Sequence, residues 1–217
     1  MEKQGHTRMV SRTINIDSSN HKTKLCKLGG ILNTDKSPFA TDGTGGHRKG
    51  YTAVYELLFA PLKFKSDVNF LEIGIERGAS TFLWEQYFEN AKLYAFEHDE
   101  QKINNVKGLA DKTNFFKVDS GNKEQLDEVF RSTGVQFDVI LEDAAHVLDH
   151  QRNAIEIGVK YLKPGGILII EDLNVNDAED IFDSVISNHF AFNTFIQCEH
   201  QNKRAENNDK LWVGIKR

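Results

Sequence analysis

Two apolar stretches of the chain each end in residues that could do chemistry together. Asp143 and His146 follow residues 137–142, and Glu171 and Asp172 follow the next such stretch. If both stretches are adjacent strands of a parallel sheet, their carboxyl ends open into one crevice, where such sheets bind ligands. Carboxylate oxygens suit a hard divalent cation such as Mg²⁺, and a neutral imidazole can act as a general base. The spacing therefore predicts a site that combines a cation with a proton acceptor.

Each of these residues also has a simpler explanation. Acids at strand ends can be solvated, and His146 can be a helix-start histidine that bonds to the backbone. We favour function for the set, because acids gathered in one crevice repel each other unless a cation or another partner neutralises them. His150 lies one helical turn beyond His146. Its role stays open between a structural contact and a direct part in the chemistry.

From residue 68 onward, short apolar stretches alternate with amphipathic ones, which predicts strands alternating with helices. The predicted strands are residues 68–73, 92–96, 114–118, 137–141 and 166–170. The predicted helices between them are residues 79–88, 100–109, 123–132 and 149–162. This alternation is typical of an α/β fold with a Rossmann-like, doubly wound sheet that is mostly parallel and has helices on both faces.

The C-terminal part is expected to complete the sheet. A further helix is predicted at residues 178–188, followed by two β-rich segments at residues 190–198 and 210–215. The charged residues 199–209 between them are predicted to be a mobile hairpin loop. The two segments would form a C-terminal antiparallel hairpin and bring the sheet to seven strands.

Residues 1–66 differ in character from the rest of the chain. Residues 1–24 contain few large apolar side chains, which predicts a poorly ordered or surface arm. Residues 51–62 carry apolar side chains at helical spacing after a glycine-rich turn, which predicts a helical cap. We therefore divide the chain into an N-terminal arm and cap or lid segment at residues 1–66 and one core domain at residues 67–217.

Composition narrows the class of protein. A chain of 217 residues is long enough for one well-buried core. Its 27 Lys and Arg against 32 Asp and Glu give a net charge of −5, which does not favour a nucleic-acid partner. No signal-like or membrane-spanning stretch is visible, so we expect a cytoplasmic protein. Cys26 and Cys198 match neither a disulfide framework nor a zinc spacing. The sequence leaves the oligomeric state, including a homo-oligomer, open.

A predicted turn between strand and helix carries Gly74 and Gly78, at the position where doubly wound sheets bind nucleotides. Glu76 stands where the dinucleotide fingerprint has its middle glycine, which disfavours a phosphate and suits a cationic ligand. Glu97 ends the next strand about twenty residues later, where an acid can accept hydrogen bonds from ribose hydroxyls. Asp119 ends the third strand, near the expected place of an adenine amino group. Each feature alone is common in turns that bind nothing, but three in register favour a nucleoside site.

Together these features resemble the class I S-adenosylmethionine-dependent methyltransferases over residues 68–217. The Lys-Pro-Gly-Gly turn at residues 163–166 and the C-terminal hairpin match as well. The resemblance implies S-adenosyl-L-methionine as cofactor, with Glu97 at the ribose and Asp119 near the adenine. The cofactor-binding residues that it implies are Glu72, Gly74, Gly78, Ser80, Glu97, Asp119, Ser120 and Glu142.

A second group of motifs points to one branch of that superfamily. The motifs are residues 142–150, 162–166 and 171–173. They resemble the metal-dependent sugar O-methyltransferases of macrolide tailoring, of the mycinamicin and macrocin type, and the related cephalosporin hydroxylase-like family. That branch carries Asp-Gly-Ser-His where this chain has Asp143-Ala144-Ala145-His146, so the acid and histidine keep their spacing while the loop shape is expected to differ. The resemblance implies that His146 is the general base. It implies a bound Mg²⁺ or Mn²⁺ with the ligands Asp143, Glu171 and Asp172.

The N-terminal part resembles the same branch at Thr34-Asp35-Lys36 and at residues 47–56. Residues 37–46 lie between these elements and are rich in glycine. They are either part of a lid over cofactor and acceptor or a tolerated surface insertion. Tyr51 and Tyr55 are expected to pack the cap helix rather than to hold a sugar.

The expected activity is transfer of a methyl group from S-adenosylmethionine to a sugar hydroxyl of a glycan or glycosylated metabolite. A divalent cation binding adjacent acceptor oxygens would favour loss of the hydroxyl proton to the base. Two other functions stay open, namely a catechol-like small-molecule O-methyltransferase and a non-catalytic cofactor-binding partner protein. A screen of acceptors separates the first, and methyl transfer that stops with a chelator excludes the second. A nucleic-acid methyltransferase is disfavoured because no basic stripe is visible.

Overall fold

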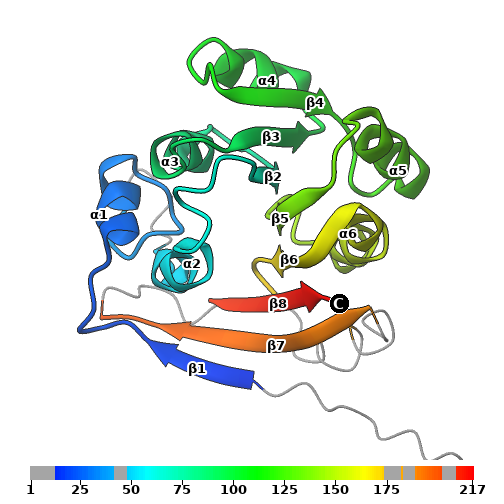
Figure 1. Cartoon of the computed structure of the whole chain (residues 1–217). Coiled ribbons are helices and arrows are strands. Elements are labelled where there is room, and N and C mark those ends of the chain that lie inside the picture. Colours follow the sequence, from blue (N-terminus) through cyan, green and yellow to red (C-terminus); the bar gives the residue numbers. More distant parts are fainter. Residues whose placement is uncertain (1–12, 42–47, 174–181, 183–188, 202–208) are drawn as a thin grey trace, which may run out of the picture.

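The computed structural model describes residues 13–41, 48–173, 182, 189–201 and 209–217 (Figure 1). Most of the predicted helix at 178–188 lies outside the described residues, as do most of the predicted loop at 199–209 and residues 42–46 of the glycine-rich stretch. The first twelve residues of the predicted N-terminal arm also lie outside them.

One sheet runs through the middle of the molecule, and eight strands of the described residues form it (Figure 1). The strand order is β1-β7-β8-β6-β5-β2-β3-β4. The strands are β1 (Thr13–Asp17), β2 (Asn69–Ile73), β3 (Lys92–Glu97), β4 (Thr113–Lys117), β5 (Phe137–Glu142), β6 (Leu162–Ile170), β7 (Phe190–Glu199) and β8 (Lys210–Lys216). Only β8 runs antiparallel to its neighbours, β6 and β7, whereas the other pairs are parallel. This confirms the predicted mostly parallel Rossmann-like sheet with a C-terminal antiparallel hairpin.

Helices cover both faces of this sheet. The helices are α1 (Lys24–Ile31), α2 (Tyr51–Phe59), α3 (Ala79–Tyr87), α4 (Glu100–Lys107), α5 (Lys123–Ser132) and α6 (Leu148–Tyr161). Side chains of α1, α2 and α3 share one apolar cluster, and those of α5 and α6 share another on the opposite face (Figure 1). Within the described residues, none of the helices has the length and apolar character needed to cross a membrane.

The alternation of side chains along β5 explains why both faces need cover. Val139 and Leu141 pack into the cluster of α1, α2 and α3, whereas Ile140 packs into the cluster of α5 and α6. Successive side chains of a strand point to opposite faces, so a strand that is apolar at every position must be buried on both. All six residues of β5 are buried. This rigid central strand ends beside the candidate site.

Two N-terminal elements were not predicted from the sequence. Residues 13–17 form β1, which pairs in parallel with β7 and adds an eighth strand to the predicted seven. Residues 24–31 form α1, whose first turn is capped because the Thr23 side chain accepts a hydrogen bond from the backbone N–H of Cys26. Within the segment predicted as a poorly ordered or surface arm, residues 13–17 are thus an edge strand of the sheet. Four of the five residues of β1 are exposed, so its sequence lacks the apolar pattern of a core strand.

Candidate active site

The sheet brings the predicted acids together at one edge. Glu142, the last residue of β5, is in register with Ile73 of β2 and with Ile170 of β6. The chain stays paired one residue further, because the backbone N–H of Asp143 donates to the carbonyl of Ile73 at 2.8 Å. Likewise the N–H of Glu171 donates to the carbonyl of Glu142 at 2.9 Å. The carboxyl ends of the two strands therefore meet as the sequence predicts.

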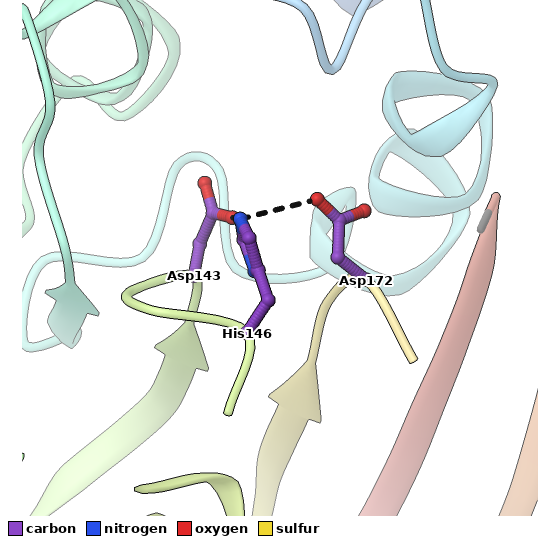
Figure 2. A group of neighbouring side chains, drawn as sticks. All are labelled: Asp143, His146 and Asp172. Atoms are coloured by element: carbon purple, nitrogen blue, oxygen red, sulfur yellow. Dashed lines mark ion pairs between the residues drawn. The ribbon is translucent and has the colours of Figure 1, made fainter. Parts of the chain in front are cut away.

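His146 lies between Asp143 and Asp172 (Figure 2). Its Nε2 is 3.4 Å from Oδ2 of Asp172 and 3.9 Å from Oδ1 of Asp143. Each of the three residues offers one ligand atom, and these atoms lie within 4.8 Å of one another. Nδ1 of His146 is buried and has no hydrogen-bond partner among the described residues. The imidazole therefore has both a neighbouring carboxylate and an unused nitrogen.

The sheet edge that carries Asp143, His146, Glu171 and Asp172 is called the rim below, and its backbone is strained at two residues. His146 has φ 53° and Asp172 has φ 52°, in the left-handed region that residues with a Cβ seldom adopt. Such conformations cost about 1–3 kcal/mol each and gather at active sites and ligand clamps. The surrounding structure maintains both residues in this geometry, which turns their side chains toward each other.

Two lysines neutralise the acids, and the sequence did not predict this role for them. The Lys36 ammonium forms ion pairs with Asp143 and with Glu171, the latter at 2.8 Å. The Lys49 ammonium forms ion pairs with Asp172 and with Asp35. The acids were expected to need a neutralising partner, and the chain itself supplies two. The signal in the sequence was the resemblance of Thr34-Asp35-Lys36 and of residues 47–56, which include Lys49, to elements of the sugar O-methyltransferases.

Two tyrosines of α2 complete the contacts of the acids. The Tyr55 hydroxyl donates to Oε1 of Glu171 at 2.6 Å, and the Tyr51 hydroxyl donates to Oδ1 of Asp172 at 2.7 Å. Both tyrosines are fully buried, and the ring of Tyr55 stacks on Phe59 at a centroid distance of 5.3 Å. The prediction that they pack the cap helix fits this, but their hydroxyls also hold the acids in place. Both oxygens of Glu171 are thereby engaged.

Burial and charge act against each other in this cluster. Burial raises the pKa of Glu171 well above its usual range, and the negative charge of Asp143 adds to the rise. Burial also raises the pKa of Asp143, although the Lys36 ammonium opposes the shift. For Lys36, burial favours the neutral amine, but Asp143 and Glu171 outweigh it and raise the pKa well above its usual value. Lys36 is therefore a permanent positive charge in the buried cluster.

A cavity of about 430 Å³ collects the residues predicted for the nucleoside. Among its lining residues are Gly74, Glu97, Asp119, Ser120 and Asp143. Gly74 has φ 91°, and a Cβ there would lie 2.2 Å from the carbonyl oxygen of Asp143. Only glycine lets the turn after β2 approach the end of β5 so closely.

Gly78 has a packing role in the same turn. It adopts φ 82° at the start of α3, and a Cβ there would lie 2.7 Å from Cγ1 of Val106. Gly78 is not among the lining residues of the cavity. It lets α3 begin against α4, which positions the turn that the cavity does contain.

The acids at the ends of β3 and β4 hold backbone N–H groups. Oε1 of Glu97 accepts hydrogen bonds from the N–H groups of His98 and Asp99, and Oε2 accepts one from Ile75 at 3.2 Å. Oδ1 of Asp119 accepts one from Gly121 at 2.8 Å. Nδ1 of His98 also lies 2.8 Å from Oε1 of Glu97, so that oxygen is fully engaged and Oε2 is the one that can accept from a ligand. Asp119 retains acceptor positions on its carboxylate.

His150 lines the 430 Å³ cavity, whereas His146 lies beside Asp143 and Asp172. Nδ1 of His150 is 3.0 Å from Oγ of Ser120, and both residues line the 430 Å³ cavity. His150 of α6 and His146 of the loop before α6 thus face different cavities.

Two of the predicted cofactor-binding acids lie beneath the cavities and do not line them. Oε1 of Glu72 accepts a hydrogen bond from Trp84, and burial raises its pKa to about 7 although the Lys36 ammonium favours the charged form. Burial raises the pKa of Glu142 to about 8, against a smaller opposing effect of the Ala144 N–H. Oε2 of Glu142 is buried and has no hydrogen-bond partner within the described ranges. These two acids support the loops that face the ligand.

A second cavity of about 620 Å³ lies on the other side of the rim. Ser80 and His146 line it, together with Asn33, Thr34 and Asp35 from the segment after α1. Asp143, Ala144 and Glu76 line both cavities, so this part of the rim separates them. Ala144, where the resembling family has glycine in its Asp-Gly-Ser-His motif, thus lies in the wall between the two cavities.

The charge of Glu76 is partly neutralised in the structure. Lys102 of α4 pairs with Glu76 at 2.5 Å. The turn therefore carries a partly neutralised acid, and its charge alone does not distinguish a cationic ligand from a phosphate.

Comparison with known proteins identifies the class of this site. Residues 71–173 match a family model described as a methyltransferase domain. This segment, just under half of the chain, is similar to methyltransferase domains. The matched residues include most of β2, all of β3 to β6 and the helices between them. They therefore include Gly74, Gly78, Asp143, Glu171 and Asp172.

Curated relatives of the methyltransferase domain act on sugars. The chain is 29% identical over 136 residues to 8-demethyl-8-(2-methoxy-alpha-L-rhamnosyl)-tetracenomycin-C 3'-O-methyltransferase of Streptomyces olivaceus, which covers 57% of this chain and 32% of that protein. It is 26% identical to mycinamicin VI 2''-O-methyltransferase of Micromonospora griseorubida, over 57% of this chain and 31% of that protein. The match thus spans about a third of the length of these relatives.

A solved structure has the same fold. The methyltransferase MycE from the mycinamycin biosynthetic pathway, in complex with Mg and SAH, superposes with a TM-score of 0.58. The superposition covers 70% of this chain and 36% of that one, at 24% sequence identity. The resemblance that the motifs suggested is confirmed at the level of the domain and its fold.

Proposed function

We propose that this protein transfers a methyl group from S-adenosylmethionine to a sugar hydroxyl of a glycan or glycosylated metabolite. The observation that carries the proposal is the position of His146, which lines the 620 Å³ cavity and lies beside Asp172 and Asp143, the latter of which lines both cavities. The cavity with Gly74, Glu97, Asp119 and Ser120 suits the nucleoside of the donor. The cavity with His146 and Thr34 to Asp35 suits the acceptor. The sugar specificity rests on the relatives and extends to this chain only as part of the proposal.

In the proposed reaction, the acceptor hydroxyl gives its proton to the imidazole of His146 as its oxygen attacks the methyl carbon. The bond between that carbon and the sulfonium breaks, its electron pair goes to sulfur, and S-adenosylhomocysteine leaves. The carboxylates of Asp143 and Asp172, 3.9 and 3.4 Å from Nε2, stabilise the imidazolium that forms. General bases of this kind contribute about 10²–10⁴-fold to the rate.

The acid cluster suits a divalent cation, because Asp143 and Asp172 present oxygen atoms close together beside an open cavity. We assign Mg²⁺ or Mn²⁺ to these two acids and to Glu171, the third ligand that the resemblance implies. When bound, such a cation makes an acceptor hydroxyl more acidic and orients it.

Residues 1–66 form the cap of the site in this proposal, and residues 67–217 form its catalytic domain. The cap contributes Asn33, Thr34 and Asp35 to the acceptor cavity, and Tyr51 and Tyr55 to the acids. It thereby places polar groups of its own where a sugar would lie.

The test is a methylation assay with purified protein, S-adenosylmethionine and two panels of acceptors, one of glycosylated metabolites and one of catechols. We expect formation of S-adenosylhomocysteine and of a methylated sugar only with the first panel. Methylation of catechols alone would favour the small-molecule alternative. Binding of the cofactor without turnover on any acceptor would favour a non-catalytic partner protein.

Removal of divalent cations is expected to abolish turnover. The reason is that the acceptor hydroxyl loses the positive charge that favours its deprotonation. The measurement is the rate after dialysis against EDTA, followed by addition of Mg²⁺, Mn²⁺ or Ca²⁺. Full activity in the presence of EDTA would contradict a role for a metal and leave the two lysines as the only cations of the cluster.

Replacement of Glu97 by glutamine is expected to weaken cofactor binding about tenfold, which is roughly the loss of one hydrogen bond to a charged group. The measurement is the Kd for S-adenosylhomocysteine by calorimetry. Glu100→Gln is the matched control. Glu100 begins α4, three residues after Glu97, and is an exposed acid that pairs with Lys117 within the described residues. An unchanged Kd for Glu97→Gln would remove Glu97 from the cofactor site.

A further inference from the structure

The two lysines of the acid cluster differ in what they could release. Lys36 is 1% exposed, and both of its ion-pair partners, Asp143 and Glu171, belong to the cluster. Lys49 pairs with Asp172 inside the cluster and with Asp35 at 3.0 Å. The Asp35 side chain is 35% exposed and lines the 620 Å³ cavity. Lys49 therefore has a partner, Asp35, that is not among the three assigned metal ligands. Within the described residues, both ion-pair partners of Lys36 are assigned ligands.

Another contact supports Lys49 away from Asp172. Its ammonium lies 5.5 Å from the centre of the Tyr51 ring, within the range of a cation–π interaction. Asp35 and this ring can keep the ammonium paired when Asp172 is engaged elsewhere. Movement of Lys49 thus leaves no buried charge without a partner.

The charge of the cluster suits a divalent cation. Four carboxylates, those of Asp35, Asp143, Glu171 and Asp172, face two ammonium groups. In their ionised forms they leave two formal negative charges. A divalent cation neutralises this excess if both lysines stay nearby, whereas expulsion of both lysines would leave the acids with an excess again.

We propose that Lys49 is a displaceable counter-cation, which yields Asp172 to a divalent cation while it stays paired with Asp35, and that Lys36 is a fixed one. This inference rests on the metal assigned under the proposed function. The lysine occupies the metal-free site and keeps the acids close together, so the site is preformed. Metal affinity is then set by competition between the cation and an ammonium for one carboxylate.

The experiment measures binding of Mn²⁺ alone, by electron paramagnetic resonance of the free ion, to the full chain without cofactor or acceptor. In Lys49→Met the competitor is gone, so we expect the Kd to fall by at least about tenfold, given the size of one close charge interaction. The metal-free variant should melt at a lower temperature than the natural protein, and Mn²⁺ should raise its melting temperature more. Lys117→Met is the matched control, because it removes the same charge from an exposed ion pair with Glu100.

Asp35→Asn separates displacement from a general effect of charge. With its second partner lost, Lys49 should hold Asp172 more firmly, and Mn²⁺ binding should weaken several-fold. In the Lys49→Met background the same substitution should change the Kd much less, because its effect passes through Lys49. Equal effects of Asp35→Asn in both backgrounds would overturn the proposal. Unchanged Mn²⁺ binding in Asp35→Asn alone would also overturn it, and that measurement does not depend on the folding of Lys49→Met.

Two further results would overturn the proposal that Lys49 is displaced by the metal. A Kd that is unchanged or higher in Lys49→Met would show that Lys49 does not compete with the metal. Absence of Mn²⁺ binding in the natural protein and in every variant would make both lysines permanent partners and overturn the proposal. Either result leaves the methylation assay untouched, so failure here is distinguishable from failure of the proposed reaction.

Discussion

His146→Ala is expected to lower kcat by about 10²–10⁴-fold and to leave the affinity for S-adenosylmethionine nearly unchanged. The imidazole lies beside Asp143 and Asp172 and lines the acceptor cavity, but it is not among the residues that line the nucleoside cavity. Its loss removes the proton acceptor and leaves the donor contacts in place. The measurement is single-turnover methyl transfer combined with calorimetric binding of the cofactor.

His150→Ala is the matched control for this change. His150 lies four residues further along the chain and contacts Ser120 in the nucleoside cavity. We expect this variant to raise the Kd of the cofactor modestly and to retain most of kcat at saturation. Full turnover of His146→Ala would remove the base from the proposed mechanism. Equal loss of kcat in both variants would show a shared structural effect.

The sequence carried enough information for the central sheet. The apolar run of β5 is buried along its whole length, and the α5 helix begins and ends at the predicted residues, Lys123 and Ser132. Asn122 accepts a hydrogen bond from the Gln125 N–H at its start, a local signal that a sequence displays directly. Such elements are set by residues close together in the chain.

The N-terminal elements could not be predicted in the same way. β1 lies at the edge of the sheet, and its pattern of mostly exposed side chains does not distinguish it from a loop. Its stability depends on pairing with β7, from Thr13 with Phe195 to Asp17 with Glu199. A partner about 180 residues away leaves no periodic signal in a five-residue segment.

The lysines of the acid cluster were missed for a related reason. Lys36 is 107 residues from Asp143, and Lys49 is 123 residues from Asp172. The sequence indicated that the negative charge of the acids needs a positive partner. It did not distinguish a metal ion from a lysine as that partner. The spacing of the acids therefore predicted where the charge lies, and only the fold showed which groups face it.

Gly74→Ala tests whether the close approach of two loops holds the whole site together. The substitution is strained by φ 91°, and its Cβ would lie 2.2 Å from the carbonyl oxygen of Asp143 and 2.7 Å from Cα of Ala144. Because those atoms belong to the backbone, the wall between the two cavities must move. We expect a loss of about 2–4 kcal/mol in the free energy of unfolding, together with loss of cofactor binding. Chemical denaturation and calorimetry measure the two effects.

Gly134→Ala isolates the part of this loss that comes from backbone conformation alone. Gly134 has φ 67°, and a Cβ there meets no atom within 4 Å among the described residues. Its replacement should cost only about 1 kcal/mol and leave cofactor binding intact. If Gly74→Ala were no less stable than Gly134→Ala and still bound the cofactor, the contact between the turn and Asp143 would not be what positions the rim. A larger loss of unfolding free energy and of cofactor binding in Gly74→Ala than in Gly134→Ala would mean that both cavities depend on the backbone contact between Gly74 and Asp143.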